Sequence, residues 1–282
     1  MLQSRVVAPN NVPLYALFGD PVEGSLSPAM QNAAFLAAGY KGTYLPFRAD
    51  ATSLPHLFAA LRAESLSGAN FTYPCKEAAA ALCDSLAAEA AAVRAVNTVR
   101  IDGAVEGFNT DVYGFERALA ASRLAVKSAP VLILGTGATA RALGFVLERA
   151  GGLLTYATRE RTRPQPLASG AVTIITLDEA ARHLAMRRPV LVANATPSGL
   201  RASDAPLFDY GAIPEGTFIF DANYGRETPL LAAARARGLP YSDGLSMLVF
   251  QGARAFEIWT GQEAPVAVMR GAAETEFRKR RL

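Results

Sequence analysis

Three short segments of this chain carry polar residues at the ends of strand-like sequence, and two of them finish in an ionisable residue. They are G-A-N-F-T-Y-P-C-K, which ends at Lys76, A-V-N-T, which ends at Thr98, and G-F-N-T-D, which ends at Asp111. A glycine-rich segment, G-T-G-A-T-A, follows from Gly135 to Ala140. A lysine and an aspartate beside a nicotinamide site form a proton donor and acceptor. The combination predicts interconversion of a ketone and an alcohol.

Lys76 is the candidate for the proton donor. Hydride addition to a carbonyl carbon leaves negative charge on the oxygen, so an acid or cation is needed within hydrogen-bond reach. Lys76 follows a strand and a Pro-Cys bend, which predicts a place at the carboxyl end of that strand, where ligands bind in α/β folds. Asp111 would hold Lys76 charged, bond a neighbouring substrate hydroxyl, or do both. The alternative is a surface lysine in the first turn of a helix and an aspartate that caps the next helix.

Further polar residues interrupt apolar strand sequence, namely Thr72, Asn97, Asn109 and Thr110. Buried polar groups need hydrogen-bond partners, and a polyhydroxylated substrate offers several. Ser25 and Ser27 precede a predicted helix, so hydroxyls and free helix amides together could hold a carboxylate. Ser27 as a simple helix cap is the alternative.

The glycine-rich segment follows four apolar residues and fits the strand, turn and helix of a dinucleotide site. Gly135 permits the turn, Gly137 lets backbone amides approach a pyrophosphate, and Ala140 serves as the small contact between helix and sheet. A merely structural glycine turn is the alternative. The next predicted strand ends in Thr158 and Arg159 instead of an acid.

The basic residues behind that strand favour NADP over NAD. Arg159 is followed closely by Arg161 and Arg163, and a guanidinium binds a 2′-phosphate in a fork. The alternative is a solvated loop in which Glu160 neutralises one of these arginines.

Strand and helix patterns alternate along the chain, which predicts an α/β fold with mainly parallel sheets. The first part contains strands at Tyr15 to Gly19, Thr43 to Phe47 and Asn70 to Tyr73, with helices at Pro28 to Ala38 and Ser53 to Ala63. Asp102-Gly103 favours a tight hairpin between Ala95 to Ile101 and Val105 to Phe108. The first sheet is therefore predicted to be mixed.

The remaining elements predict a doubly wound Rossmann domain followed by two helices. Its strands are expected at Val131 to Leu134, Leu153 to Ala157, Val172 to Thr176, Val190 to Ala193 and Thr217 to Asp221. No predicted strand follows the last two helices, which are Leu245 to Trp259 and Val266 to Arg278. These helices would therefore complete the first domain. We therefore expect a substrate domain at residues 1–111 and 245–282, and a dinucleotide domain at 112–244.

Bulk properties indicate an ordinary globular enzyme. The chain has 282 residues, 51% of them hydrophobic, and a formal net charge of +3, so two domains are expected and no dense basic stripe for nucleic acid is present. Two cysteines and two histidines lack metal-ligand spacing. The N-terminus lacks the pattern of a secretory signal, and the alanine-rich stretch after Lys76, where a helix is expected, carries too many charges for a membrane span. A cytoplasmic location and a monomer or homodimer are expected.

The ordered motifs resemble the shikimate dehydrogenase family, which reduces 3-dehydroshikimate to shikimate with NADPH. The resemblance also includes G-D-P-V-E-G-S-L-S-P from Gly19, N-A-T-P-S-G-L from Asn194, D-A-N-Y-G-R-E-T-P-L from Asp221 and D-G-L-S-M-L-V-F-Q from Asp243. It implies that Lys76 and Asp111 are the catalytic pair. It further implies substrate contacts from Ser25, Ser27, Thr72, Asn97, Tyr224 and Gln251, and cofactor contacts from Gly135, Gly137, Ala138, Thr158, Arg159, Thr196 and Gly244.

Some positions depart from the usual family pattern. Gly24 precedes Ser25 where the family has histidine, Gln31 stands in place of another histidine, and Arg94 replaces a glycine. These departures are compatible with a divergent branch, so two alternatives accompany the shikimate prediction. One is quinate or another cyclic polyol acid with NAD or NADP, and the other is a catalytically weak NADP-binding regulatory module.

Overall fold

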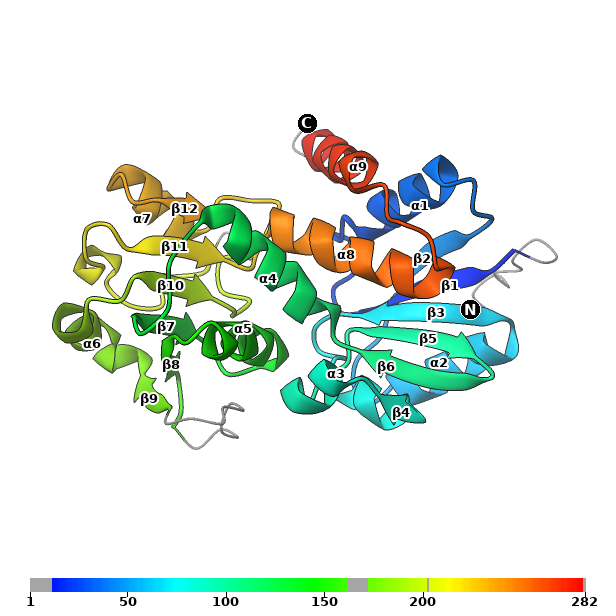
Figure 1. Cartoon of the computed structure of the whole chain (residues 1–282), viewed down its shortest axis with the longest axis horizontal. Coiled ribbons are helices and arrows are strands. Elements are labelled where there is room, and N and C mark those ends of the chain that lie inside the picture. Colours follow the sequence, from blue (N-terminus) through cyan, green and yellow to red (C-terminus); the bar gives the residue numbers. More distant parts are fainter. Residues whose placement is uncertain (1–11, 162–171, 202, 281–282) are drawn as a thin grey trace. The chain divides into compact units, whose positions relative to one another are not determined.

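The computed structural model describes residues 12–161, 172–201 and 203–280 (Figure 1). The chain divides into two compact units. One comprises Met1–Thr110 and Gln251–Leu282, and the other comprises Asp111–Phe250. Helices α4 (Thr110–Ser122) and α8 (Leu245–Thr260) carry the chain between them. The expectations for the N-terminal segment before residue 12 and for Arg163 lie outside the described residues.

The first unit is built on a mixed sheet with the strand order β2-β1-β3-β5-β6-β4. Strand β1 pairs in parallel with β2 and β3, whereas β5 runs antiparallel to β3 and β6. The strands are β1 Leu14–Gly19, β2 Thr43–Arg48, β3 Leu66–Phe71, β4 Ser85–Leu86, β5 Thr98–Asp102 and β6 Ala104–Phe108. Gly103 turns the β5–β6 hairpin at a φ of +69°, a backbone region that glycine adopts freely. The predicted hairpin and mixed sheet are confirmed.

The helices of this unit pack on the sheet or on one another. They are α1 Ser27–Ala37, α2 Leu54–Ala63, α3 Ala88–Val93 and α9 Val266–Lys279, with the short 3₁₀ helix η1 Ala78–Leu82. Asn32 ties α1 to β2, because its amide oxygen accepts from Tyr44 N and its amide nitrogen donates to Tyr44 O, each at 2.9 Å. Trp259 of α8 donates to Val99 O at 2.9 Å. A Cβ at Gly68 would lie 2.5 Å from that indole nitrogen, so glycine allows α8 to contact the sheet.

The alanine-rich stretch after Lys76 is divided into η1, β4 and α3, although alanine is the strongest helix former and a helix was expected here. Asp84 is the reason, since its carboxylate accepts from Val105 N at 2.7 Å and its own N–H donates to Val105 O at 2.8 Å. These bonds start the pairing of β4 with β6. Arg94 then ends α3 with a φ of +53°, a left-handed conformation that favours glycine. Glycine, the usual residue of the family at this position, adopts this conformation without strain.

The second unit contains an all-parallel sheet with the order β12-β11-β10-β7-β8-β9. Its strands are β7 Pro130–Leu134, β8 Leu153–Thr158, β9 Thr173–Thr176, β10 Leu191–Asn194, β11 Phe218–Asp221 and β12 Tyr241–Ser242. The chain moves from β7 to β8 and β9 on one side, and from β10 to β11 and β12 on the other. The switch point therefore lies between β7 and β10, and the predicted doubly wound fold is confirmed.

Helices α5 Ala138–Arg149, α6 Ala180–Arg187 and α7 Pro229–Ala236 connect these strands, with 3₁₀ turns η2 Leu177–Glu179 and η3 Tyr210–Ala212. A Cβ at Gly144 would collide with the Tyr156 hydroxyl, so α5 lies close against β8. In the described part of the chain, no helix is long and apolar enough to cross a membrane. The same described residues contain no group of three or more His, Cys, Asp or Glu side chains that would hold a metal ion.

Candidate active site

Strand direction gathers the polar residues of the first unit at one edge of its sheet. The carboxyl ends of β1 and β3 lie at the same edge, because these strands are parallel. The start of β5 and the end of β6 lie there too, since β5 is antiparallel to both of its neighbours. The segments that leave or enter this edge carry Ser25, Ser27, Thr72, Lys76, Asn97 and Thr110.

Asn97, Thr98, Thr110 and Gln251 form a buried group that we call the amide cluster. Asn97 Nδ2 donates to Thr110 Oγ1 at 3.0 Å and to Gln251 Oε1 at 3.3 Å. Asn97 Oδ1 accepts from the N–H of Thr110 at 2.6 Å. All four side chains are buried. The structure therefore brings together two predicted substrate-binding residues, Asn97 and Gln251, that are 154 positions apart in sequence.

Two supporting residues were absent from the sequence prediction. Asn70 Nδ2 donates to Thr98 Oγ1 at 2.9 Å, and Tyr44 OH donates to Asn70 Oδ1 at 2.8 Å. Asn70 is a polar residue inside strand β3 and is 5% exposed. The same signal that singled out Asn97, an amide within apolar strand sequence, would have found Asn70.

Ser25 and Ser27 lie where the chain leaves β1 and enters α1. The cap expectation is wrong for Ser27, because α1 begins at Ser27 itself, with Leu26 as the preceding residue and no capping side chain. Instead, Ser25 Oγ accepts from Ser27 N at 3.2 Å. The carbonyl of Ser25 accepts from an Arg280 guanidinium nitrogen at 3.2 Å. The C-terminal helix thus holds the turn that carries both serines.

Lys76 and Asp111 follow β3 and β6, respectively. Lys76 is half-buried in a turn before η1, and its carbonyl accepts from Val96 N at 2.9 Å. Asp111 is 5% exposed in the first turn of α4. Because that helix begins at Thr110, Asp111 does not occupy a capping position ahead of it. Its chain neighbour Thr110 belongs to the amide cluster.

Thr72 and Asn109 complete the polar set at this edge. Thr72 N donates to Phe18 O at 2.8 Å, and a Cβ at Gly19 would collide with the Thr72 methyl group. Asn109 is 1% exposed, and its Nδ2 donates to Ala95 O at 2.9 Å. Among the described residues, Asn109 Oδ1 has no hydrogen-bond partner. This oxygen is a buried acceptor two positions before the predicted catalytic aspartate.

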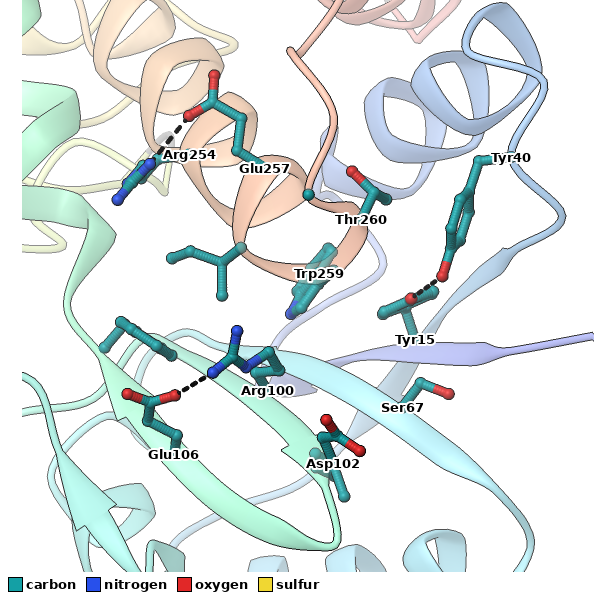
Figure 2. A pocket seen from close by; sticks show the side chains of 14 residues that line it. Tyr15, Tyr40, Ser67, Arg100, Asp102, Glu106, Arg254, Glu257, Trp259 and Thr260 are labelled. Atoms are coloured by element: carbon teal, nitrogen blue, oxygen red, sulfur yellow. Dashed lines mark hydrogen bonds and ion pairs between the residues drawn. The ribbon is translucent and has the colours of Figure 1, made fainter.

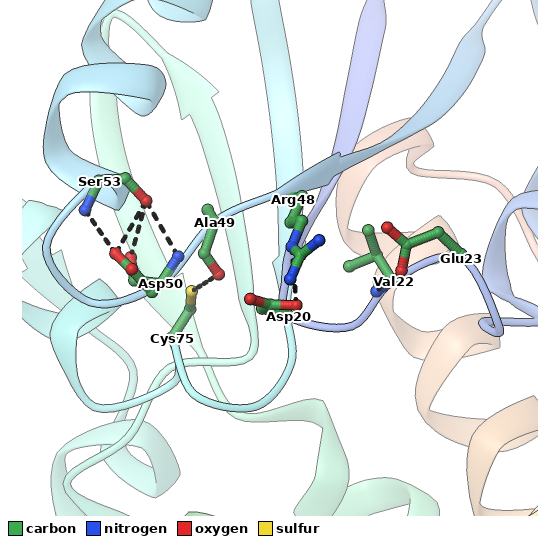
Figure 3. Close-up of polar contacts among 8 residues, drawn as sticks. All are labelled: Asp20, Val22, Glu23, Arg48, Ala49, Asp50, Ser53 and Cys75. Carbon is green, nitrogen blue, oxygen red and sulfur yellow. Dashed lines mark hydrogen bonds and ion pairs between the residues drawn. The ribbon is translucent and has the colours of Figure 1, made fainter.

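Polar contacts connect the segments at the ends of β1, β2 and β3 (Figure 3). Arg48 and Asp20 form an ion pair at 2.9 Å. Cys75 Sγ donates to Ala49 O at 3.2 Å, and burial raises the pKa of this thiol to about 11. Cys75 is therefore protonated at neutral pH, and thiolate chemistry has no support here.

A cavity of about 610 Å³ lies elsewhere in the first unit, between the β5–β6 hairpin and the end of α8 (Figure 2). Its charged side chains include two ion pairs, Arg100 with Glu106 at 2.6 Å and Arg254 with Glu257 at 3.2 Å. None of the predicted site residues lines it. Apart from Phe108 of β6, the strand residues that line it lie away from the edge with the amide cluster. Because none of the predicted residues lines this cavity, it is not the candidate site.

The glycine turn of the second unit has the geometry expected for a dinucleotide. Gly135 follows β7 with a φ of +99°, which requires glycine in practice. Gly137 precedes α5, and a Cβ there would meet nothing within 4 Å. Open space thus lies before the N-terminal amides of α5, which begins at Ala138, and such amides bind phosphate groups. These residues fit a dinucleotide pyrophosphate.

Thr196 and Gly244 lie at the same edge of the second sheet. A Cβ at Gly135 would lie 2.8 Å from the Thr196 methyl group, so the turns after β7 and β10 are in close contact. A Cβ at Gly244 would collide with Ala222 O, which explains the need for glycine. Tyr224 is half-buried in the segment after β11.

Arg159 and Arg161, the basic residues directly after β8, differ in their contacts. Thr158 is 5% exposed at the end of β8, and Arg159 is exposed beyond it. Arg161 forms an ion pair with Glu179, so the expectation that Glu160 neutralises an arginine is not what the described residues show. The Thr176 N–H and Arg161 lower the pKa of Glu179 to about 2. Arg159 forms no ion pair with another described residue, and its contact with a 2′-phosphate stays a prediction.

Comparison with known proteins decides the family. The model for the shikimate dehydrogenase substrate binding domain matches residues 17–99, and the model for the shikimate 5'-dehydrogenase C-terminal domain matches residues 244–274. The shikimate dehydrogenase (NADP(+)) of Methanothrix thermoacetophila is 39% identical over 92% of this chain and 96% of its own length. The chain belongs to the shikimate dehydrogenase family. The predicted resemblance is thus confirmed.

Solved structures of the family share the fold. Shikimate 5-dehydrogenase from Thermus thermophilus, in complex with NADP(H) and shikimate, has a TM-score of 0.82 and 36% identity, covering 94% of this chain and 99% of that one. Quinate dehydrogenase from Corynebacterium glutamicum, in complex with NAD, has the same TM-score at 31% identity and covers the same fractions. Proteins of this fold therefore include some that are named for different cyclic acids.

Proposed function

We propose that this chain is an NADP-dependent oxidoreductase that interconverts 3-dehydroshikimate and shikimate. The observation that carries the proposal is the buried amide cluster at the sheet edge that also bears Lys76. Neutral amides both donate and accept hydrogen bonds, as recognition of several ring hydroxyls requires. Family membership supports the same assignment.

The two parts of the chain would divide the work. Residues 1–111 and 245–282 would hold the substrate, with Ser25 and Ser27 at its carboxylate and Thr72, Asn97 and Gln251 at its hydroxyls. Tyr224 would reach the same carboxylate from the second unit. Residues 112–244 would hold NADP through Gly135, Gly137, Ala138, Thr158, Arg159, Thr196 and Gly244. The open space before α5 supports the pyrophosphate position. A cytoplasmic location and a monomer or homodimer remain predictions.

Lys76 and Asp111 would handle the proton. Bound NADPH supplies a hydride to the carbonyl carbon of 3-dehydroshikimate. Lys76 gives a proton to the carbonyl oxygen as negative charge grows there, and takes it back in the reverse reaction. Asp111 would orient Lys76 and would accept a hydrogen bond from the neighbouring hydroxyl. The half-buried position of Lys76 limits competing water.

Oxidation of quinate with NAD is the second candidate, because a quinate dehydrogenase in complex with NAD shares this fold at 31% identity. The two functions differ in cofactor charge and in the substrate ring. Arg159 favours NADP. Initial rates with shikimate and quinate, each with NADP and NAD, separate the candidates.

The expected outcome is fastest reduction of NADP with shikimate. A higher kcat/KM with quinate and NAD would replace the proposal by the second candidate. No reduction with any pair, together with measurable NADP binding, would favour the regulatory module.

A further inference from the structure

Asp221 is a fully buried carboxylate at the end of β11. The described residues that donate hydrogen bonds to it lie at the end of β10 and in the segment after β11. Its Oδ1 accepts from Asn194 Nδ2 at 3.0 Å and from Asn223 N at 3.0 Å. Its Oδ2 accepts from Thr228 Oγ1 at 2.6 Å. The exposed fraction of the residue is 0%. Burying a charge is costly unless several donors compensate for lost water, so this arrangement needs a reason.

Asn194 and Asn223 connect Asp221 to the turn after β10. Asn194 Oδ1 accepts from Thr196 N at 3.0 Å and from Thr196 Oγ1 at 2.7 Å. Asn223 Nδ2 donates to Thr196 O at 3.0 Å and to Ser198 O at 3.1 Å. Thr196 therefore has its N–H, hydroxyl and carbonyl all bonded to residues that Asp221 holds.

The same group also reaches the loop before α8. Asn223 O accepts from Gly244 N at 3.0 Å. Asp221 thus connects two segments, at Thr196 and Gly244, that are more than forty positions apart in the printed sequence. Both segments leave the carboxyl edge of the second sheet.

The turn held in this way borders the switch point between β7 and β10. Thr196 lies so close to Gly135 that a Cβ on that glycine would come within 2.8 Å of its methyl group. Ligands of doubly wound folds bind in the crevice at the switch point. A displaced Thr196 would therefore enter or widen the space beside the glycine turn.

We propose that Asp221 is a positioning residue for the dinucleotide, holding the turn at residues 194–198 against Gly135 through Asn194 and Asn223. The proposal rests on the proposed function only in taking a dinucleotide at this edge. Asp221 does not need to touch the ligand. Its effect is to fix the backbone on one side of the crevice before the ligand binds, which lowers the ordering cost of binding.

Thr228→Ala is the matched control for Asp221→Ala. Thr228 donates to the other carboxylate oxygen and caps α7 by accepting from Leu231 N. Its loss weakens the same buried group without removing the bonds to Asn194 and Asn223. A purely structural role predicts that both variants change NADP affinity in proportion to their loss of stability.

The readout is the Kd of NADP without shikimate, measured by fluorescence or calorimetry on the full chain, alongside the unfolding midpoint. We expect Asp221→Ala to weaken NADP binding about tenfold or more, from the loss of two bonds that fix the turn, with the KM of shikimate nearly unchanged. Thr228→Ala should retain wild-type NADP affinity. Asp221→Asn should restore affinity, because its amide oxygen still accepts from both asparagines.

Equal weakening of NADP binding by Asp221→Ala and Thr228→Ala, or wild-type affinity in Asp221→Ala, would overturn the inference. If Asp221→Ala does not fold, Asn223→Ala is the deciding variant. It removes the side-chain bonds to Thr196 O and Ser198 O and keeps the backbone N–H that donates to Asp221. Unchanged NADP affinity in Asn223→Ala would then refute the role. A wild-type chain that fails to bind NADP refutes the proposed function instead.

Discussion

Among the described residues, each unit has a buried polar group at the sheet edge where its predicted site residues lie, and the two groups differ in charge. The amide cluster of the first unit consists of neutral side chains around Asn97. The group in the second unit is built around the carboxylate of Asp221. Both lie where strands end and loops begin.

The difference in charge gives the two buried groups different hydrogen-bonding capacities. An amide donates and accepts, so a cluster of amides and hydroxyls can exchange partners with a hydroxylated ligand. A carboxylate only accepts, and the bonds that Asp221 accepts come from its own loops. We infer that the first group meets the substrate, whereas the second shapes the backbone around the cofactor.

Replacement of Lys76 tests the chemistry assigned to the first unit and has the largest expected effect. We expect Lys76→Ala to lower kcat by about 10²- to 10⁴-fold, the usual contribution of a positioned acid or base. NADP affinity should be retained, because the cofactor residues belong to the second unit. Initial rates and NADP titrations measure the two quantities. Lys41→Ala, at an exposed lysine of the same unit, is the control, and a kcat for Lys76→Ala equal to that of Lys41→Ala would remove the assignment.

Replacement of Arg159 is the corresponding test in the second unit. Loss of a charged hydrogen bond to the 2′-phosphate should raise the KM of NADP by about 10- to 100-fold. The KM of NAD should stay near the wild-type value, because NAD lacks that phosphate. Arg161→Ala should have a much smaller effect, since Arg161 is paired with Glu179. Equal changes in the KM values of NAD and NADP would show that Arg159 does not bind the 2′-phosphate.

The pH dependence of stability distinguishes the two buried groups directly. Burial raises the pKa of Asp221, despite hydrogen bonds that act in the opposite sense. Because the folded state then holds this proton more tightly than the unfolded state, the contribution of Asp221 to stability is greatest below about pH 4, the ordinary range for the carboxyl. It falls as pH rises through the folded-state pKa.

Asp221→Asn should remove that component of the pH dependence, whereas Asn97→Ala should leave it in place. Urea unfolding at a series of pH values measures the free energy of unfolding for wild type and both variants. Parallel curves for wild type and Asp221→Asn would contradict the assigned titration.

Arg280 provides the smallest expected effect and tests the edge of the first unit. Arg280→Ala removes the bond to the Ser25 carbonyl and should raise the KM of shikimate about twofold, since an exposed contact of this kind contributes little. The KM of NADP should not change. Glu276→Ala, which removes only the ion pair of Arg280, is the control. An unchanged KM of shikimate would show that the Ser25 turn does not depend on the C-terminal helix.

Most of the fold follows from local sequence patterns. The strand before Gly135 and the Asp102-Gly103 hairpin were predicted because apolar periodicity and turn residues agree there. The alanine-rich stretch after Lys76 was predicted wrongly, because pairing with β6 through Asp84 outweighs the helix preference of alanine. Propensity is a weak guide where a tertiary bond competes.

A site residue was predictable where its type was unusual for the local sequence pattern. Asn97 stood out as an amide in an apolar strand, and Gly135 as a glycine in a turn. The partners of Arg161 and Asp221 were not predictable, since Glu179 and Asn194 are distant in sequence and their contacts depend on sheet order. Ser27 is not a cap, because the helix starts one residue earlier than its sequence pattern predicts.

Transfer of deuterium tests the central claim most directly. Shikimate that carries deuterium on the carbon bearing the oxidised hydroxyl is incubated with the purified chain and NADP, and the reduced cofactor is analysed by mass spectrometry. We predict reduced NADP that contains the label, formed by wild type and nearly absent with Lys76→Ala. Reduced cofactor without label, or no reduction by the wild-type chain, would contradict this mechanism.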